Sequence, residues 1–119
     1  MAVAAGLVAW IGEAMAPVGT VTHRAMMGGA TLYCDGTIFA LVADDLLWFK
    51  ADAQSDAQWD AAGAVRFNYT MGEGRTGSMN YRRAPDDCYD DADALRDWAM
   101  LALAAGARAP VKRTRPRAG

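Results

Sequence analysis

Cysteine and histidine are scarce in this chain of 119 residues, which has two cysteines and one histidine. Cys34 and Cys88 have no spacing typical of metal ligands, and two cysteines make no disulfide framework, so the sequence favours a reducing compartment. The apolar N-terminal stretch lacks a basic region, and Glu13 interrupts it well short of the length of a membrane span. We therefore expect a cytoplasmic protein that does not cross a membrane.

Positive charge is scarce up to Ala107, where 14 acidic residues stand against 7 basic ones and give a net charge of about −7. A body of this charge repels nucleic acid. The remaining basic residues lie at the end of the chain and are Arg108, Lys112, Arg113, Arg115 and Arg117. Five charges predict contact with nucleic acid that is weak at most and is lost at moderate salt. We expect residues 1–106 to form one domain and residues 107–119 a basic, disordered tail.

Three strands joined by two tight turns are expected between Thr31 and Ala51. Asp35-Gly36 tolerates the positive φ angles of a type I′ hairpin turn, and Asp44-Asp45 marks the second turn. Alternation along this meander predicts one face that packs on the core and a second apolar face on the other side. The residues predicted for the core face are Leu32, Phe39, Leu41, Leu47 and Phe49. The residues predicted for the opposite face are Ile38, Ala40, Val42 and Trp48.

The other segments supply three helices, from apolar residues at helical spacing, and three more strands, from β-branched and aromatic runs. The expected helices span residues 2–16, 56–62 and 91–105, and the expected strands span residues 21–26, 65–69 and 76–81. The order helix, four strands, short helix, two strands, helix is typical of an α+β fold, a two-layer sandwich in which helices flank an antiparallel sheet of five to six strands. Helices on one side of the sheet and apolar residues on the other predict a homodimer.

Several short motifs of the sequence match the pattern of one protein family. They are Arg24-Ala25-Met26-Met27-Gly28-Gly29, Leu32-Tyr33-Cys34-Asp35-Gly36, Phe39-Ala40-Leu41, Leu47-Trp48-Phe49-Lys50-Ala51-Asp52 and Ser78-Met79-Asn80-Tyr81. In this combination the chain resembles the N-terminal domain of the TfoX/Sxy family of bacterial competence regulators, over nearly its whole length from the first helix to the last. Met27 stands where the family usually has Phe. We expect a stand-alone domain, without the separate C-terminal domain of larger family members.

The resemblance implies a fold similar to secretion chaperones and a non-enzymatic regulatory domain with no cofactor. It also implies a link to the regulation of DNA-uptake genes alongside the cyclic-AMP receptor protein, so we expect a protein partner, with the transcription machinery as a candidate. The sheet surface and the turn over residues 26–29 are the expected contact regions. The candidate residues, which carry the family motifs, are Arg24, Met26, Met27, Gly28, Gly29, Tyr33, Asp35, Gly36, Lys50, Met79 and Tyr81.

Two other function classes stay open at the level of the sequence. A small enzyme would use Cys34 as a nucleophile, if a cation or a helix N-terminus stabilised its thiolate, or His23 as a general base. A weak nucleic-acid binder would use the basic tail. The stretch from Gly72 to Gly77 matches G-x-G-x-x-G, but a predicted strand follows it where a dinucleotide site requires a helix, so it reads as a hairpin loop. A small site for an anionic partner is also conceivable at Arg24, Arg82 and Arg83.

Overall fold

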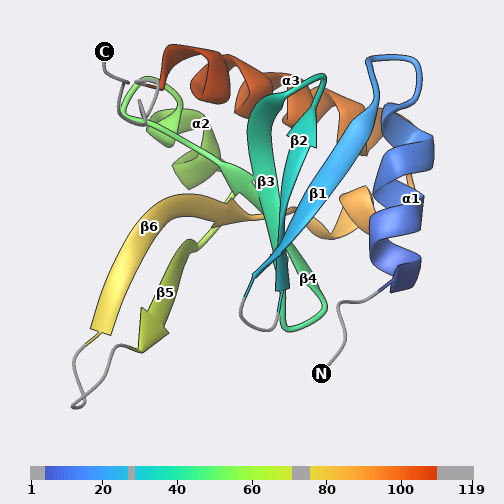
Figure 1. Cartoon of the computed structure of the whole chain (residues 1–119). Helices are drawn as coiled ribbons and strands as arrows, with labels where there is room; N and C mark the ends of the chain where they lie inside the picture. The colour runs from blue at the N-terminus through green and yellow to red at the C-terminus, as the bar shows by residue number, and fades with distance from the viewer. Residues whose placement is uncertain (1–4, 27–28, 71–75, 110–119) are drawn as a thin grey trace, which may run out of the picture.

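The computed structural model describes residues 5–26, 29–70 and 76–109, which fold into one layer of strands and one layer of helices (Figure 1). The elements are α1 (Ala5–Met15), β1 (Val21–Met26), β2 (Gly29–Cys34), β3 (Thr37–Ala43), β4 (Leu46–Lys50), α2 (Asp56–Ala61), β5 (Arg66–Thr70), β6 (Thr76–Arg83), the short 3-10 helix η2 (Asp86–Tyr89) and α3 (Ala92–Arg108). The six strands form one antiparallel sheet in the order β1-β2-β3-β4-β6-β5. This confirms the predicted α+β class and the predicted order of elements.

All three helices pack on the same side of the sheet, which we call the helix-bearing face. α1 and α3 contribute Ile11 and Leu95 to the core, and both side chains are fully buried. α2 contributes Trp59, whose ring stacks on Phe49 of β4 at 5.7 Å and on Trp98 of α3 at 4.7 Å between ring centroids. A helix of six residues has little stability of its own, so this stacking of aromatic rings holds α2 in place.

Both turns of the meander β2–β3–β4 have left-handed backbones at their two central residues. Asp35 and Gly36 have φ angles of 49° and 86°, and Asp44 and Asp45 have φ angles of 55° and 62°. Positive φ at both positions is what a type I′ turn requires, so both predicted hairpins are confirmed. Glycine adopts this conformation at little cost, whereas aspartate is strained in it. The second turn, with two aspartates, is therefore the more strained of the two.

A β-bulge at Phe39 decides which side chains of β3 face the helices. Leu32 of β2 pairs with Ala40, whereas the next residue, Tyr33, pairs with Ile38. One extra residue, Phe39, is therefore inserted in β3, and the alternation of its side chains shifts by one position. Phe39 and Ala40 are consecutive in the chain, yet both are fully buried in the core that the helices cover.

The bulge makes part of the predicted division between the two faces wrong. Leu41, predicted on the core face, lies opposite Thr31 of β2 and Trp48 of β4 on the side away from the helices. Ala40 and Val42, predicted on the opposite face, belong to the core under the helices. The other predicted core residues are in that core, and they are Leu32, Phe39, Leu47 and Phe49.

The last helix is longer than predicted. α3 continues to Arg108, although the sequence suggested an end at Ala105 with Gly106 after it. Gly106 lies inside the helix at its approach to β3, where an added Cβ atom would lie 2.0 Å from the carbonyl oxygen of Ile38. The glycine thus permits close packing of helix and sheet instead of ending the helix. Arg108, assigned to the tail from the sequence, is the last residue of α3.

Candidate interaction surface

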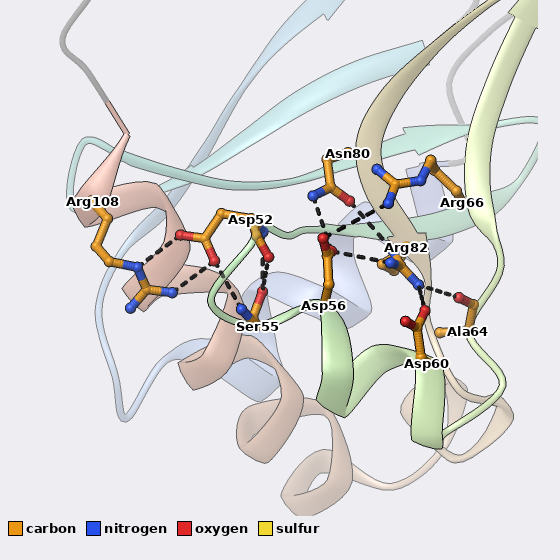
Figure 2. Close-up of polar contacts among 9 residues, drawn as sticks. All are labelled: Asp52, Ser55, Asp56, Asp60, Ala64, Arg66, Asn80, Arg82 and Arg108. Carbon is orange, nitrogen blue, oxygen red and sulfur yellow. Dashed lines mark hydrogen bonds and ion pairs between the residues drawn. The ribbon is translucent and has the colours of Figure 1, made fainter.

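A cluster of polar side chains fastens α2 to β6 (Figure 2). Its centre is Arg82, which is only 4% exposed. The guanidinium donates hydrogen bonds to carboxylate oxygens of Asp56 at 3.0 Å and Asp60 at 2.7 Å, to the carbonyl oxygen of Ala64 at 2.9 Å and to Oδ1 of Asn80 at 3.3 Å. Because these acceptors already bind the buried guanidinium, the cluster stabilises the fold and does not attract an external anion.

A separate ion pair joins the end of α3 to the loop between β4 and α2 (Figure 2). Nε and Nη2 of Arg108 donate to the two carboxylate oxygens of Asp52 at 2.7 Å and 2.9 Å. These hydrogen bonds, with those from Ser55, lower the pKa of Asp52 to about 2. The bidentate geometry attaches Arg108 to the folded domain, unlike the free tail residue that was predicted.

The two cysteines lie where their thiols stay protonated. Burial, and to a lesser extent the charge of Asp35, raises the pKa of Cys34, and burial raises the pKa of Cys88 to about 12. A cysteine nucleophile or metal ligand reacts as a thiolate, so these surroundings oppose such chemistry.

His23 is exposed on β1, and within the described residues no hydrogen bond joins it to Cys34. The described part of the chain also contains no group of three or more His, Cys, Asp or Glu side chains placed to hold a metal ion.

The other side of the sheet, which we call the open face, carries a continuous row of side chains across five strands. Arg24, Thr31, Leu41, Trp48 and Arg83 lie directly opposite one another in β1, β2, β3, β4 and β6. Neighbouring strands are about 4.8 Å apart, so the two arginines at the ends are separated by about 19 Å at the backbone. By register and contacts, the open face comprises Thr22, Arg24, Thr31, Tyr33, Ile38, Leu41, Ala43, Leu46, Trp48, Lys50, Phe67, Tyr81 and Arg83.

Aromatic rings gather on the open face over β4, β6 and β5. Trp48 and Phe67 meet edge to face with ring centroids 4.9 Å apart. The ammonium nitrogen of Lys50 lies 5.2 Å from the centre of the Tyr81 ring, a cation–π contact. Burial, and secondly the neighbouring Tyr33, raises the pKa of Tyr81 to about 12. Apart from Lys50 and Arg83, the described side chains in this half of the open face are therefore uncharged.

Every charged side chain of the open face is positive. None of the six described strands contains Asp or Glu. Arg24, Lys50 and Arg83 form no ion pair with any carboxylate of the described residues, whereas Arg82, on the helix-bearing face, lies 3.0 Å from Asp56. The open face is thus a basic patch on a domain that is acidic as a whole. The three arginines that the sequence grouped as one anion site lie on two different faces.

A family model for the TfoX N-terminal domain matches residues 13–106, from within α1 almost to the end of α3. The chain belongs to the TfoX N-terminal domain family. This confirms the resemblance that the sequence motifs indicated. No curated protein matches the chain significantly. In the parts of this TfoX N-terminal domain that the structure describes, no helix has the length and apolar character needed to span a membrane.

The open face unites four of the residues that carry the TfoX-like motifs. Arg24, Tyr33, Lys50 and Tyr81 come from four different strands, β1, β2, β4 and β6. The motifs are far apart in the sequence, and only the register of the sheet places these side chains on one side. The family pattern of this TfoX N-terminal domain therefore corresponds in part to a surface, in addition to the turns that shape the sheet.

Other motif residues of the TfoX N-terminal domain lie at turns and strand ends. Asp35 and Gly36 form the β2–β3 turn, and a carboxylate oxygen of Asp35 accepts a hydrogen bond from the backbone N–H of Thr20 at 3.0 Å. Met26 ends β1, and Met79 lies in β6 with its backbone paired to β5. These positions fix the shape of the meander and the hairpin.

Gly29, predicted in a turn, begins β2, where an added Cβ atom would lie 2.1 Å from the carbonyl oxygen of Val42. The remaining candidates lie outside the described residues, and they are Met27, Gly28, Lys112, Arg113, Arg115 and Arg117.

Sequence reasoning missed the row through Leu41, because the bulge reverses the face on which Leu41 lies. It also missed that Arg82 and Arg83 point to opposite faces, which follows from strand alternation once β6 is extended by two residues beyond Tyr81.

Proposed function

We propose that this TfoX N-terminal domain is a non-enzymatic regulatory domain that binds a protein partner through its open face. The observation that carries the proposal is the gathering of four motif residues, from four strands, on one side of the sheet. A family pattern that served only folding would concentrate in the core and the turns. Here part of it lies on the side away from the helices, where Arg24 is exposed and Tyr33 and Lys50 are half-buried.

The chemistry of the open face suits protein binding. Tryptophan, tyrosine and arginine are the residue types that most often dominate the energy of protein interfaces, and all three are present. Trp48 and Tyr33 are half-buried, so each offers part of its ring to a partner while the rest packs on the sheet. The raised pKa of the Cys34 thiol supports a binding role more than a catalytic one.

The proposal includes a cytoplasmic role in the regulation of DNA-uptake genes. Its support is membership of the TfoX N-terminal domain family together with the resemblance of the motifs to those of competence regulators. A partner within the transcription machinery fits that role.

Affinity capture from a native lysate of the source cells tests the proposal. The tagged wild-type domain is expected to recover RNA polymerase or a transcription factor, and Trp48→Ser and Tyr33→Ser are each expected to lose it. Met100→Ser is the matched control, because Met100 is an apolar residue of α3 that is 52% exposed on the helix layer. Unchanged capture by both open-face variants, with circular dichroism showing a folded domain, would contradict the proposal.

A further inference from the structure

We infer that the partner presents an acidic amphipathic helix to the open face. The inference rests on the proposed function, since it names the chemistry of the partner for the same surface. Its starting point is the row across the sheet, in which the exposed residues Arg24 and Arg83 flank an apolar centre. Within that centre Leu41 is 2% exposed and supports the row from below, and the accessible apolar area comes from half-buried Trp48.

Within the described part of the chain, the arginines at the two ends of the row are free to bind carboxylates of a partner. Arg24 and Arg83 have no ion-pair partner among the described carboxylates, and arginine offers a fork that matches a carboxylate in two hydrogen bonds. Lys50, two residues along β4 from Trp48, adds a third positive charge. An acidic segment therefore complements this face, whereas a second copy docked through the same face would bring like charges together. The predicted homodimer, if it forms, is expected to use another surface.

The direction of the row determines the secondary structure of the partner. The row runs across the strands, so a segment lying along it cannot pair its backbone with any one strand. An extended segment would leave its N–H and C=O groups against the apolar ring of Trp48, whereas a helix satisfies these groups internally. A span of about 19 Å corresponds to about 13 helical residues. The helix therefore has carboxylates near both ends and apolar residues at i, i+3, i+4 and i+7 between them.

The geometry favours a protein segment over single-stranded nucleic acid, the other ligand that cations and aromatic rings attract. Stacking of bases requires accessible ring faces. Tyr81 is 7% exposed with the ammonium group of Lys50 over its ring, and Trp48 and Phe67 are engaged with each other.

Fluorescence anisotropy with labelled synthetic peptides tests the inference. The probe is a helical peptide of about 15 residues, with glutamates in its first and last turns and leucines at i, i+3, i+4 and i+7 between them. The comparison peptide has lysines in place of the glutamates. At low salt the domain is expected to bind the glutamate peptide about tenfold more tightly than the lysine peptide. The preference should shrink at about 0.5 M salt, because the paired charges are screened.

Charge reversal on the protein supplies the second measurement. The double variant Arg24→Glu, Arg83→Glu is expected to prefer the lysine peptide, and both side chains are exposed, so the fold is retained. Asp97→Lys, which reverses an exposed charge on α3, is the matched control and should keep the preference of the wild type. Equal affinity for the two peptides, or a preference that the double variant does not change, would overturn the inference.

Two further outcomes separate this inference from the proposed function. Tighter binding of labelled oligodeoxythymidine than of the glutamate peptide, lost in the double variant, would assign the face to nucleic acid and overturn the inference. Lysate capture that is lost with Trp48→Ser but kept by the Arg24→Glu, Arg83→Glu variant would also overturn it and leave the proposed function standing. Capture unaffected by Trp48→Ser and Tyr33→Ser contradicts the proposed function itself.

Discussion

Replacing Gly106 by alanine tests how closely α3 packs on the sheet. In an isolated helix this substitution stabilises, since alanine is the better helix former by about 1 kcal/mol. In this domain the new methyl group would lie 2.0 Å from the carbonyl oxygen of Ile38 and 3.1 Å from Cγ2 of Thr37. The carbonyl belongs to the backbone of β3, an interior strand of the sheet, so it cannot rotate away. The helix itself must move.

Overpacking costs about 1–3 kcal/mol, and a Cβ atom 2.0 Å from a fixed backbone oxygen belongs to the upper part of that range, about 2–3 kcal/mol. After subtraction of about 1 kcal/mol of helix propensity, we expect Gly106→Ala to destabilise the domain by about 1–2 kcal/mol. In a domain of this size that loss lowers the melting temperature by about 5–10 °C. The end of α3 also carries Arg108, so its ion pair with Asp52 is expected to weaken in the same variant.

Thermal unfolding followed by circular dichroism measures the effect, with Gly12→Ala as the matched control. Gly12 lies within α1, and an added Cβ atom there meets nothing within 4 Å. This control should raise the melting temperature by about 3–5 °C, because only the propensity term acts. If Gly106→Ala raised the melting temperature as Gly12→Ala does, the close approach of α3 to β3 would be refuted.

Three further predictions concern stability. Asp56→Ala should destabilise the domain by about 2 kcal/mol in chemical denaturation, because it leaves the buried Arg82 guanidinium without one of its carboxylate partners. Arg82→Met should cost less, because it removes the buried charge itself. A larger loss of stability for Arg82→Met than for Asp56→Ala would contradict this reasoning. Asp45→Gly should stabilise by about 0.5–1 kcal/mol by relieving the left-handed strain at φ 62°, and a lower melting temperature would argue against it. The pKa of Asp52 is lowered to about 2, so the stability it contributes is present above its ordinary pKa near 3.8 and is lost as pH falls through about 2. Asp52→Asn should therefore melt below the wild type at pH 6, and the difference should vanish as pH falls below about 2. A difference that persists below that pH would refute a role for the Arg108 ion pair.

The sequence alone predicted the strands and turns because their signals are local. Asp35-Gly36 marks its hairpin without help from the rest of the chain, and both hairpins of the meander formed as expected. The spacing of apolar residues in α1 and α3 likewise needs only a short stretch of sequence. The resemblance to a known family supplied Arg24, Tyr33 and other residues as candidates, but it did not show that they share a surface.

What the sequence could not predict depends on contacts between distant segments. The bulge at Phe39 exists only in the pairing of β3 with β2, yet it moves Leu41 from the predicted core to the open face. Gly106 resembles a helix stop until β3 is placed beside it. The burial of Arg82 likewise follows from the position of α2, whose aspartates come from a segment more than twenty residues earlier in the chain.

The ion pair at the end of α3 sets the direction in which anything joined to the domain can extend. Arg108 is bound to Asp52, so Ala109 leaves the folded part next to the loop before α2, in the layer of helices (Figure 1). A linker or a neighbouring protein fused directly after Ala109 therefore starts on the far side of the sheet from Trp48. Immobilising the domain by such a fusion leaves its basic, aromatic side turned outward to the solution.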